Sequence, residues 1–316
     1  MVRGWILEVE GKIAGFLGCI PLSYQWDGRS CLAMTPTAWD VLPEYRTYAL
    51  RLFAEQMELA AGGILWDTTP TAQVRQVSLR LGFVPVPYEC QNQYHVFRDR
   101  GGLLEWRLRS RGVDSWWPAR LSRLERMAGR VVTPWRARQT TRHTVRVITH
   151  PDAVGQEFDR LWERTRSVRS HTRVRSAQWV RWYCFGSSGL RKLLVGCWLG
   201  ESLVAFGIFR EQIQRGKRPD ALPARFLECL DLWHDPDHHD SVGAVLDHLL
   251  VNLDPWRVLG VTLYDFPACV PWLRGVRDTV RTPGTPDGLY LLPASMREAA
   301  QRETPCLFLA EGDVGL

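Results

Sequence analysis

One pattern of residues occurs twice in this chain and limits what the chain can fold into. Two apolar runs flank a short polar turn at residues 5–20, and the same arrangement returns at residues 193–209. The turns are Glu10-Gly11 and Gly200-Glu201. Apolar β-rich runs around a short glycine turn are typical of a β-hairpin. The sequence therefore predicts one hairpin in each half.

The residues after each hairpin also follow the same order. An acidic strand end runs into Pro43 in the first half and into Pro236 in the second. Apolar residues at helical spacing then predict helices over 45–61 and 241–253, and the short strands 64–67 and 261–264 follow. This order, found twice, predicts an α+β fold with two similar domains, each a mixed, mostly antiparallel sheet flanked by helices.

The size of the chain agrees with two domains and a connector. Its 316 residues are 45% hydrophobic and 23% charged, which is ordinary globular composition. We expect domains at 1–97 and 147–316, joined by a partly helical connector at 98–146 that holds 13 arginines and 4 acidic residues. A solvated helix with a few ion pairs explains this charge, and contact with nucleic acid or another anionic surface is the weaker alternative. The net charge of +6 does not call for nucleic acid as a partner.

The cysteines and the termini indicate a reducing compartment. None of the eight cysteines forms a C-x-x-C pair, which argues against a structural zinc site. Glu8 and Glu10 stand where a signal peptide needs apolar residues, so we expect a cytoplasmic protein. The apolar stretch 193–209 is interrupted at Gly200-Glu201-Ser202, which favours a hairpin over a membrane span.

Other catalytic patterns are missing or incomplete. The chain has neither a G-x-S-x-G elbow nor a G-x-x-x-x-G-K-[ST] loop, which argues against a serine hydrolase and a P-loop nucleotidase. The segment 234–240 combines histidines and aspartates, with His248 downstream. Its spacing matches no closed set of metal ligands, so we expect no metal site and interpret it as a helix-capping loop.

Two ordered motifs in the first half carry a resemblance to a known family. Residues 41–51, V-L-P-E-Y-R-T-Y-A-L-R, follow the pattern V-x-P-x-[YFW]-[RQ]-x-x-G-x-[GA], and Leu81-Gly82-Phe83 comes after a predicted short helix. Both motifs are similar to those of the Gcn5-related N-acetyltransferase (GNAT) family. The second half resembles the C-terminal half of bacterial tandem GNAT-like proteins at 158–162, 175–185, 231–236 and 308–313.

The resemblance implies an acyl-CoA donor, such as acetyl-CoA, in the first domain. It places the pantetheine arm alongside Val41 and Leu42. It places the pyrophosphate against the next helix, at Arg46, Thr47, Tyr48, Ala49, Leu50 and Arg51. Ala49 and Arg51 stand where the family has glycines that let backbone N–H groups close around phosphate.

Three residues are candidates for proton transfer. Asp40 or Glu44 could take a proton from the attacking amine, directly or through water. Ser78 falls where the family often has a tyrosine that protonates the leaving thiolate. The first strand and first two helices of the family fold have no counterpart before Trp5, so the first domain is truncated, has a misassigned start, or is completed by the other domain.

The sequence thus favours an acyl-CoA-dependent N-acyltransferase acting on an unidentified small-molecule or peptide amine. Two other functions stay open: a catalytically degenerate GNAT pair that acts as a binding or scaffold protein, and an aminoacyl- or peptidoglycan-type transferase. The second domain is expected to bind CoA poorly, because the arginine or glutamine of the phosphate motif is missing before Gly243. Nothing in the sequence indicates an oligomeric state or an acyl-chain length.

Overall fold

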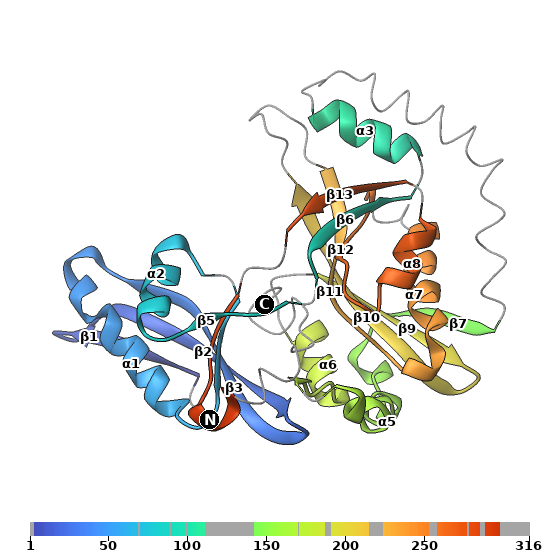
Figure 1. Ribbon diagram of the computed structural model, residues 1–316. Helices are drawn as coiled ribbons and strands as arrows, with labels where there is room; N and C mark the ends of the chain where they lie inside the picture. Colours follow the sequence, from blue (N-terminus) through green and yellow to red (C-terminus); the bar gives the residue numbers. More distant parts are fainter. Residues whose placement is uncertain are drawn as a thin grey trace. The chain divides into compact units, whose positions relative to one another are not determined.

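The computed structural model describes residues 3–68, 70–88, 90–98, 100–110, 142–169, 171–186, 191–214, 224–252, 258–276, 278–284 and 288–297. These residues form two compact units, each built around its own sheet (Figure 1). Unit 1 comprises the described residues of 1–89, 166–174 and 286–316, and unit 2 comprises those of 90–165 and 175–285. The two units are described separately below.

The sheet of unit 1 begins with two tight hairpins. Its strand order is β1 (Gly4–Val9), β2 (Lys12–Trp26), β3 (Arg29–Val41), β4 (Ile64–Asp67), β14 (Leu289–Leu291) and β5 (Val84–Pro85), and β8 (Thr172–Arg173) also pairs with β2. The turn residues Glu10 and Gly11 have φ of 52° and 76°, and Asp27 and Gly28 have φ of 50° and 71°. Two successive residues with positive φ form the turn whose twist suits a two-residue hairpin. The predicted first hairpin is therefore confirmed.

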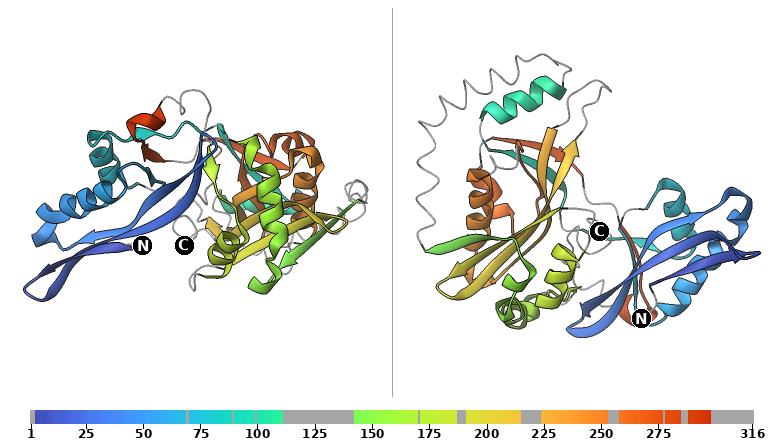
Figure 2. Two further views of the ribbon diagram at one scale, coloured as in Figure 1. Left: turned by 90° about the horizontal axis from the view of Figure 1, so that it is seen from below. Right: turned by 180° about the vertical axis from the view of Figure 1, so that it is seen from behind.

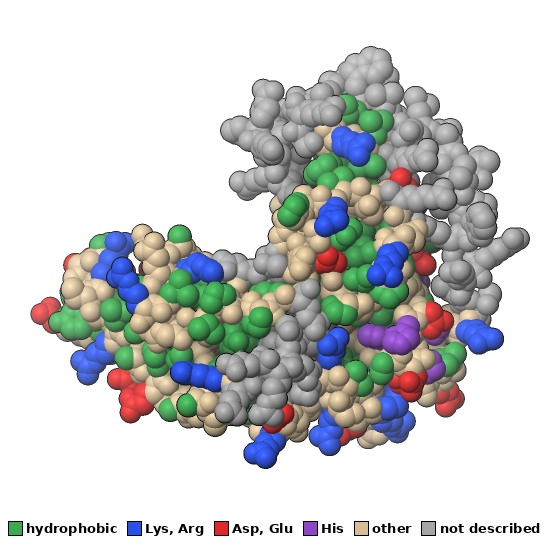
Figure 3. Space-filling model, viewed as in Figure 1, with side chains coloured by type: hydrophobic (Ala, Val, Ile, Leu, Met, Phe, Trp, Pro, Cys, Tyr) green, Lys and Arg blue, Asp and Glu red, His purple; other side chains and the backbone are tan. Residues whose placement is uncertain are grey.

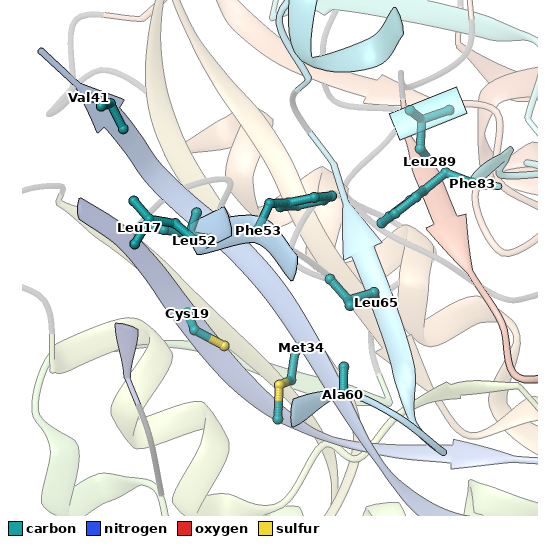
Figure 4. Close-up of a cluster of buried hydrophobic side chains, with 10 residues drawn as sticks. All are labelled: Leu17, Cys19, Met34, Val41, Leu52, Phe53, Ala60, Leu65, Phe83 and Leu289. Atoms are coloured by element: carbon teal, nitrogen blue, oxygen red, sulfur yellow. The ribbon is translucent and has the colours of Figure 1, made fainter. Parts of the chain in front are cut away.

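Helices cover one face of this sheet. The 3₁₀ helix η1 (Pro43–Tyr48) runs into α1 (Ala49–Leu59), and α2 (Ala72–Arg80) follows β4. Phe53 of α1 and Phe83, just after α2, lie in one hydrophobic cluster with strand residues such as Leu17 and Leu65 (Figure 4). Burying these side chains removes apolar surface from water and fixes both helices on the same face.

The sheet of unit 2 has seven strands among the described residues (Figure 2). Their order is β13 (Thr279–Pro283), β6 (Asn92–Phe97), β12 (Gly260–Tyr264), β11 (Ala224–His234), β10 (Ser202–Gln214), β9 (Lys192–Leu199) and β7 (His143–Ile148). The helices are α3 (Arg100–Ser110), α5 (Gln156–Thr165), α6 (Ala177–Phe185), α7 (Asp240–Val251) and α8 (Val270–Gly275), with 3₁₀ turns η3 (Pro151–Ala153), η4 (Arg166–Val168, in unit 1) and η5 (Pro236–His238). Phe158 of α5 contacts Phe206 of β10 at 5.3 Å between ring centroids, so α5 packs directly on the sheet.

The predicted repeat is present in both units. In unit 1, β2 pairs antiparallel with β3, β3 pairs parallel with β4, and α1 connects β3 to β4. β10, β11, α7 and β12 repeat this arrangement. The stretch 193–209 is a hairpin, as its internal Gly200 predicted; Gly200 has φ of 60°.

Each sheet includes strands from outside the corresponding predicted domain range, 1–97 or 147–316. β6 lies within the sheet of unit 2, where it pairs with both β12 and β13. Conversely, β8 and β14 come from the later half and join the sheet of unit 1. Unit 1 therefore incorporates strands from the C-terminal half of the chain. Within the expected connector at 98–146 the structure describes helix α3 and the start of β7, and residues 111–141 lie outside the described part.

Three further features concern the cysteines, the length of the helices and groups that could bind a metal. The seven cysteines in the described part are free, and six of them are buried. No helix among the described residues is both long and apolar enough to cross a membrane. Histidine side chains appear at the surface of unit 2 (Figure 3), and within the described ranges no three His, Cys, Asp or Glu residues are grouped to hold a metal ion.

Candidate functional site

β3 and β4 separate soon after they begin to pair. Their parallel register covers only Ala33 with Ile64 and Met34 with Leu65. β3 then continues to Val41, and among the described strands none pairs with its residues 35–41 on the side facing β4. Seven residues at the usual rise of a strand give a free edge of roughly 20 Å. Such an edge can hydrogen-bond an extended ligand that carries amides.

A bulge lies in the middle of this free edge. The register of β3 against β2 shifts between Phe16 and Gly18, and Ala38 has φ of 49°. A positive φ is uncommon for a residue with a Cβ and is found where the chain must bend locally. The bulge therefore turns the end of β3, with Trp39 stacked on Phe53 of α1 at 5.1 Å between ring centroids.

The residues after β3 form a helix start that suits an anion. The Tyr45 N–H donates to the Leu42 carbonyl at 2.9 Å and closes the first turn of η1. Tyr48 and Ala49 have φ of −91° and −57°, so this turn needs no glycine at position 49. The first turn of α1 carries no acidic residue, and Arg51 in that turn is exposed, as is Arg46 in η1. A helix N-terminus with neighbouring arginines attracts phosphate.

The structure brings the predicted donor-site residues together as one continuous segment. Leu42 and Tyr48 are each 47% exposed, and Leu50 is 52% exposed. Thr47 is exposed as well, whereas the Val41 side chain is buried in the cluster beneath α1. Val41 can therefore meet a ligand only through its backbone.

The candidates for proton transfer lie in different surroundings. Asp40 at the end of β3 and Glu44 in η1 are both exposed, four residues apart on either side of the turn. Ser78 on α2 is fully buried, and its Oγ has no hydrogen-bond partner among the described residues. Thr71 caps α2, since its Oγ1 accepts from the Val74 N–H at 3.3 Å.

The face of the sheet opposite α1 carries a row of buried rings, here called the aromatic layer: Tyr290, Trp66, Tyr24, Trp26 and His171. Successive ring centroids lie 5.4, 5.7, 6.2 and 4.2 Å apart. Thr35, fully buried, belongs to the same face, because its β2 partner Ile20 packs against this cluster. Sequence analysis did not single out Thr35 or Trp66; the alternation along β3 and β4 was the only signal for them.

Unit 2 has the same strand separation but a different helix start. β11 and β12 pair from Phe226 to Glu228 and then part. Both 3₁₀ helices have a carboxylate in the first turn, Glu44 in η1 and Asp237 in η5. The units differ in the next helix, because the first turn of α7 holds Asp240, which would repel a phosphate, whereas that of α1 holds no acidic residue. Asp235 already caps η5: its side chain accepts from the Asp237 N–H at 3.1 Å and from Arg164 Nε at 2.6 Å. Burial favours a raised pKa for Asp235, but these hydrogen bonds outweigh it and lower the pKa below its usual value.

Several solved structures resemble this chain over most of its length. A GCN5-related N-acetyltransferase from Anabaena variabilis matches with a TM-score of 0.54 at 11% identity, over 91% of this chain and 62% of its own. N-myristoyltransferase from Saccharomyces cerevisiae with bound myristoyl-CoA matches with a TM-score of 0.53 at 11% identity, over 89% of this chain and 63% of its own. Eis1 from Mycobacterium abscessus matches with a TM-score of 0.51 at 17% identity, over 92% of this chain and 64% of its own.

These similarities establish the fold: the chain has a tandem GNAT-like architecture. The chain spans less than two thirds of the length of each of these three proteins. No protein-family model matches the sequence, and no curated protein matches it.

Proposed function

We propose that this protein is an N-acyltransferase that moves an acyl group from an acyl-CoA to an amine, with the donor bound in unit 1. The observation that carries the proposal is the free edge of β3, which leads directly into a helix start flanked by Arg46 and Arg51. CoA has the matching chemistry, because an amide-bearing pantetheine arm follows its pyrophosphate. The tandem GNAT-like fold, shared with acyltransferases, supports the same reaction.

Each part of the site has a role in this proposal. The two arginines and the N–H groups at the start of α1 hold the pyrophosphate, with Thr47, Ala49 and Leu50 alongside it. The arm runs beside the backbone of Val41 and Leu42 toward Met34. A backbone N–H of the free edge donates to the thioester oxygen and stabilises the negative charge that develops there.

The chemistry then needs a neutral amine and a leaving thiolate. The amine nitrogen attacks the thioester carbon, a C–N bond forms, and the C–S bond breaks to release CoA as its thiolate. The proton from the nitrogen passes to Asp40 or Glu44, directly or through water, because these carboxylates lie at the exposed end of β3. The thiolate takes its proton from solvent, and the buried Ser78 hydroxyl is the weaker candidate for supplying it.

Thiol release from acetyl-CoA in the presence of a panel of primary amines tests the reaction. Activity should fall at least about tenfold in Asp40→Asn or Glu44→Gln, whichever carries the base, and Ser78→Ala measures the part played by the hydroxyl. Glu163→Gln, an exposed carboxylate on α5 in unit 2, is the control and should keep full activity. Turnover that depends on neither carboxylate would remove them from the mechanism.

A catalytically inactive CoA-binding protein is the second candidate. The observation in its favour is the burial of Ser78, which leaves α2 without an exposed hydroxyl at the position expected for the acid. CoA binding without turnover on any amine would support it. Turnover that requires aminoacylated tRNA in place of acyl-CoA would support the aminoacyl-type transferase.

Free, mostly buried cysteines also lead us to propose a reducing cytoplasm as the location of the protein.

A further inference from the structure

Trp66 stands at the point where β3 and β4 separate. The last paired residues are Met34 and Leu65, so Thr35 and Trp66 are the next residues along their strands. Both side chains lie on the face opposite α1, and Trp66 is only 1% exposed. The closed end of the opening between the two strands is therefore bordered on this face by an indole ring.

The indole is held there by its neighbours on both sides. It stacks on Tyr290 of β14 with 5.4 Å between ring centroids. On the other side it meets Tyr24 of β2 at 5.7 Å, and the two rings reach toward each other over Ala33 of β3, which contributes only a methyl group. Close-packed interiors of this kind do not yield space without displacing a ring.

Two buried hydrogen-bond donors lie at this point, one on each strand. Trp66 Nε1 and Thr35 Oγ1 have no hydrogen-bond partner among the described residues, and both side chains are at least nine-tenths buried. Unpaired buried donors are costly, and a ligand oxygen would relieve that cost. The oxygen of a thioester can accept such hydrogen bonds, whereas the methylenes of a long acyl chain cannot.

We infer that the donor is a short-chain acyl-CoA, acetyl- or propionyl-CoA, and that Trp66 sets this limit. The inference rests on the proposed donor site in unit 1. A pantetheine arm that runs along β3 from α1 toward Met34 delivers its thioester to the closed end of the strand opening. A two- or three-carbon acyl group ends there, and a longer chain has to displace Trp66 or its stacked neighbours.

Calorimetric titration with CoA, acetyl-CoA, butyryl-CoA and octanoyl-CoA tests the inference on the intact chain. Each methylene beyond the limit should weaken binding, since one surplus methylene in a filled apolar pocket changes discrimination by about tenfold or more. We expect octanoyl-CoA to bind at least about 100-fold more weakly than acetyl-CoA. Equal affinities for the two would overturn the inference while leaving the donor site intact.

Two matched variants identify the residue responsible. Trp66→Leu should narrow the gap between acetyl- and octanoyl-CoA at least about tenfold and leave the affinity for CoA itself unchanged. Trp26→Leu makes the same change in the same aromatic layer, but at the far end of β2 beside the turn, and should keep the wild-type ratio. Equal ratios in both variants would overturn the role of Trp66.

Failure of the proposed donor site gives a different result from failure of the chain-length limit. Failure of CoA and every acyl-CoA to bind the wild-type protein would contradict the proposed function and the inference with it. If Trp66→Leu does not fold, as judged by circular dichroism, Trp66→Phe provides a smaller cavity, and the wild-type chain-length series still decides the question.

Discussion

Arg175 and Asp231 form an ion pair that is wholly removed from solvent. Arg175 Nε lies 2.9 Å from Oδ2 of Asp231, and Nη2 lies 3.0 Å from Oδ1, with both side chains 0% exposed. The guanidinium also lies over the Trp233 ring, 4.3 Å from its centroid. Asp231 is on β11 beyond the last residue that pairs with β12. Unit 2 thus has an internal ion pair beside the separation of β11 and β12.

Removing one partner of this pair should destabilise the protein strongly. Arg175→Met leaves a buried carboxylate without its cation, which costs about 3–5 kcal/mol. The double variant Arg175→Met with Asp231→Leu replaces both charges by apolar groups and should recover most of that loss. Urea unfolding measures both effects. An Arg175→Met protein as stable as the wild type would contradict the buried pair.

Because β6 pairs with β12 in unit 2, adding a single methyl group to Gly260 of β12 should destabilise the protein. A Cβ added to Gly260 of β12 would clash with the Val96 carbonyl oxygen and lie 2.9 Å from the Phe97 Cα, both on β6. Gly260→Ala should therefore lower the free energy of unfolding by about 1–3 kcal/mol.

Gly275→Ala is the control for this prediction, because a Cβ there meets nothing within 4 Å. It should change stability by less than about 0.5 kcal/mol. The same denaturant titration compares the two variants. Equal effects would argue that β6 and β12 do not lie side by side.

Burial of His95 predicts a dependence of stability on pH. His95 lies on β6 and its Nδ1 is 2.9 Å from Thr262 Oγ1, and burial lowers its pKa below the usual value. As the pH falls, His95 is therefore protonated at a higher pH in the unfolded chain than in the folded protein. The contribution of His95 to stability is fully present above about pH 6.5 and is lost as the pH falls through the folded-state pKa.

Urea unfolding at several pH values between 5 and 8 checks this slope. His95→Gln should lose a part of the pH dependence, at most about 1.4 kcal/mol per pH unit. His248 has its pKa lowered by burial too, but it is present in both proteins and cancels from the comparison. A His95→Gln profile identical to that of the wild type would contradict the prediction.

Local signals made much of the fold predictable. The hairpin turns at Glu10-Gly11 and Gly200-Glu201 could be identified because positive φ favours glycine within a short polar turn. The helices that became α1 and α7 followed from apolar spacing. These signals operate within a few residues, which is why the two similar units could be inferred.

Pairing between distant segments was beyond the same reasoning. No local sequence signal shows that Asn92–Phe97 pairs with β12 and β13 and not with strands of the first sheet. Likewise, none shows that Leu289–Leu291 pairs with β4. Site residues could be predicted only where the two motifs gave positions, at residues 40–51 and at Ser78, and they stay a prediction. The ring contacts of Trp66 with Tyr24 and Tyr290 could not be predicted either, because these residues come from different strands.

Calorimetric titration of CoA into the wild type, Arg51→Glu and Arg160→Glu tests the donor site in unit 1 most directly. Arg51 is exposed in the first turn of α1, and Arg160 is equally exposed on α5 of unit 2. We expect the wild type to bind CoA and Arg160→Glu to match it, whereas Arg51→Glu should bind at least about tenfold more weakly because a charged hydrogen bond to phosphate is lost. No binding by the wild type at millimolar CoA, or equal affinities in the two variants, would contradict the proposed donor site.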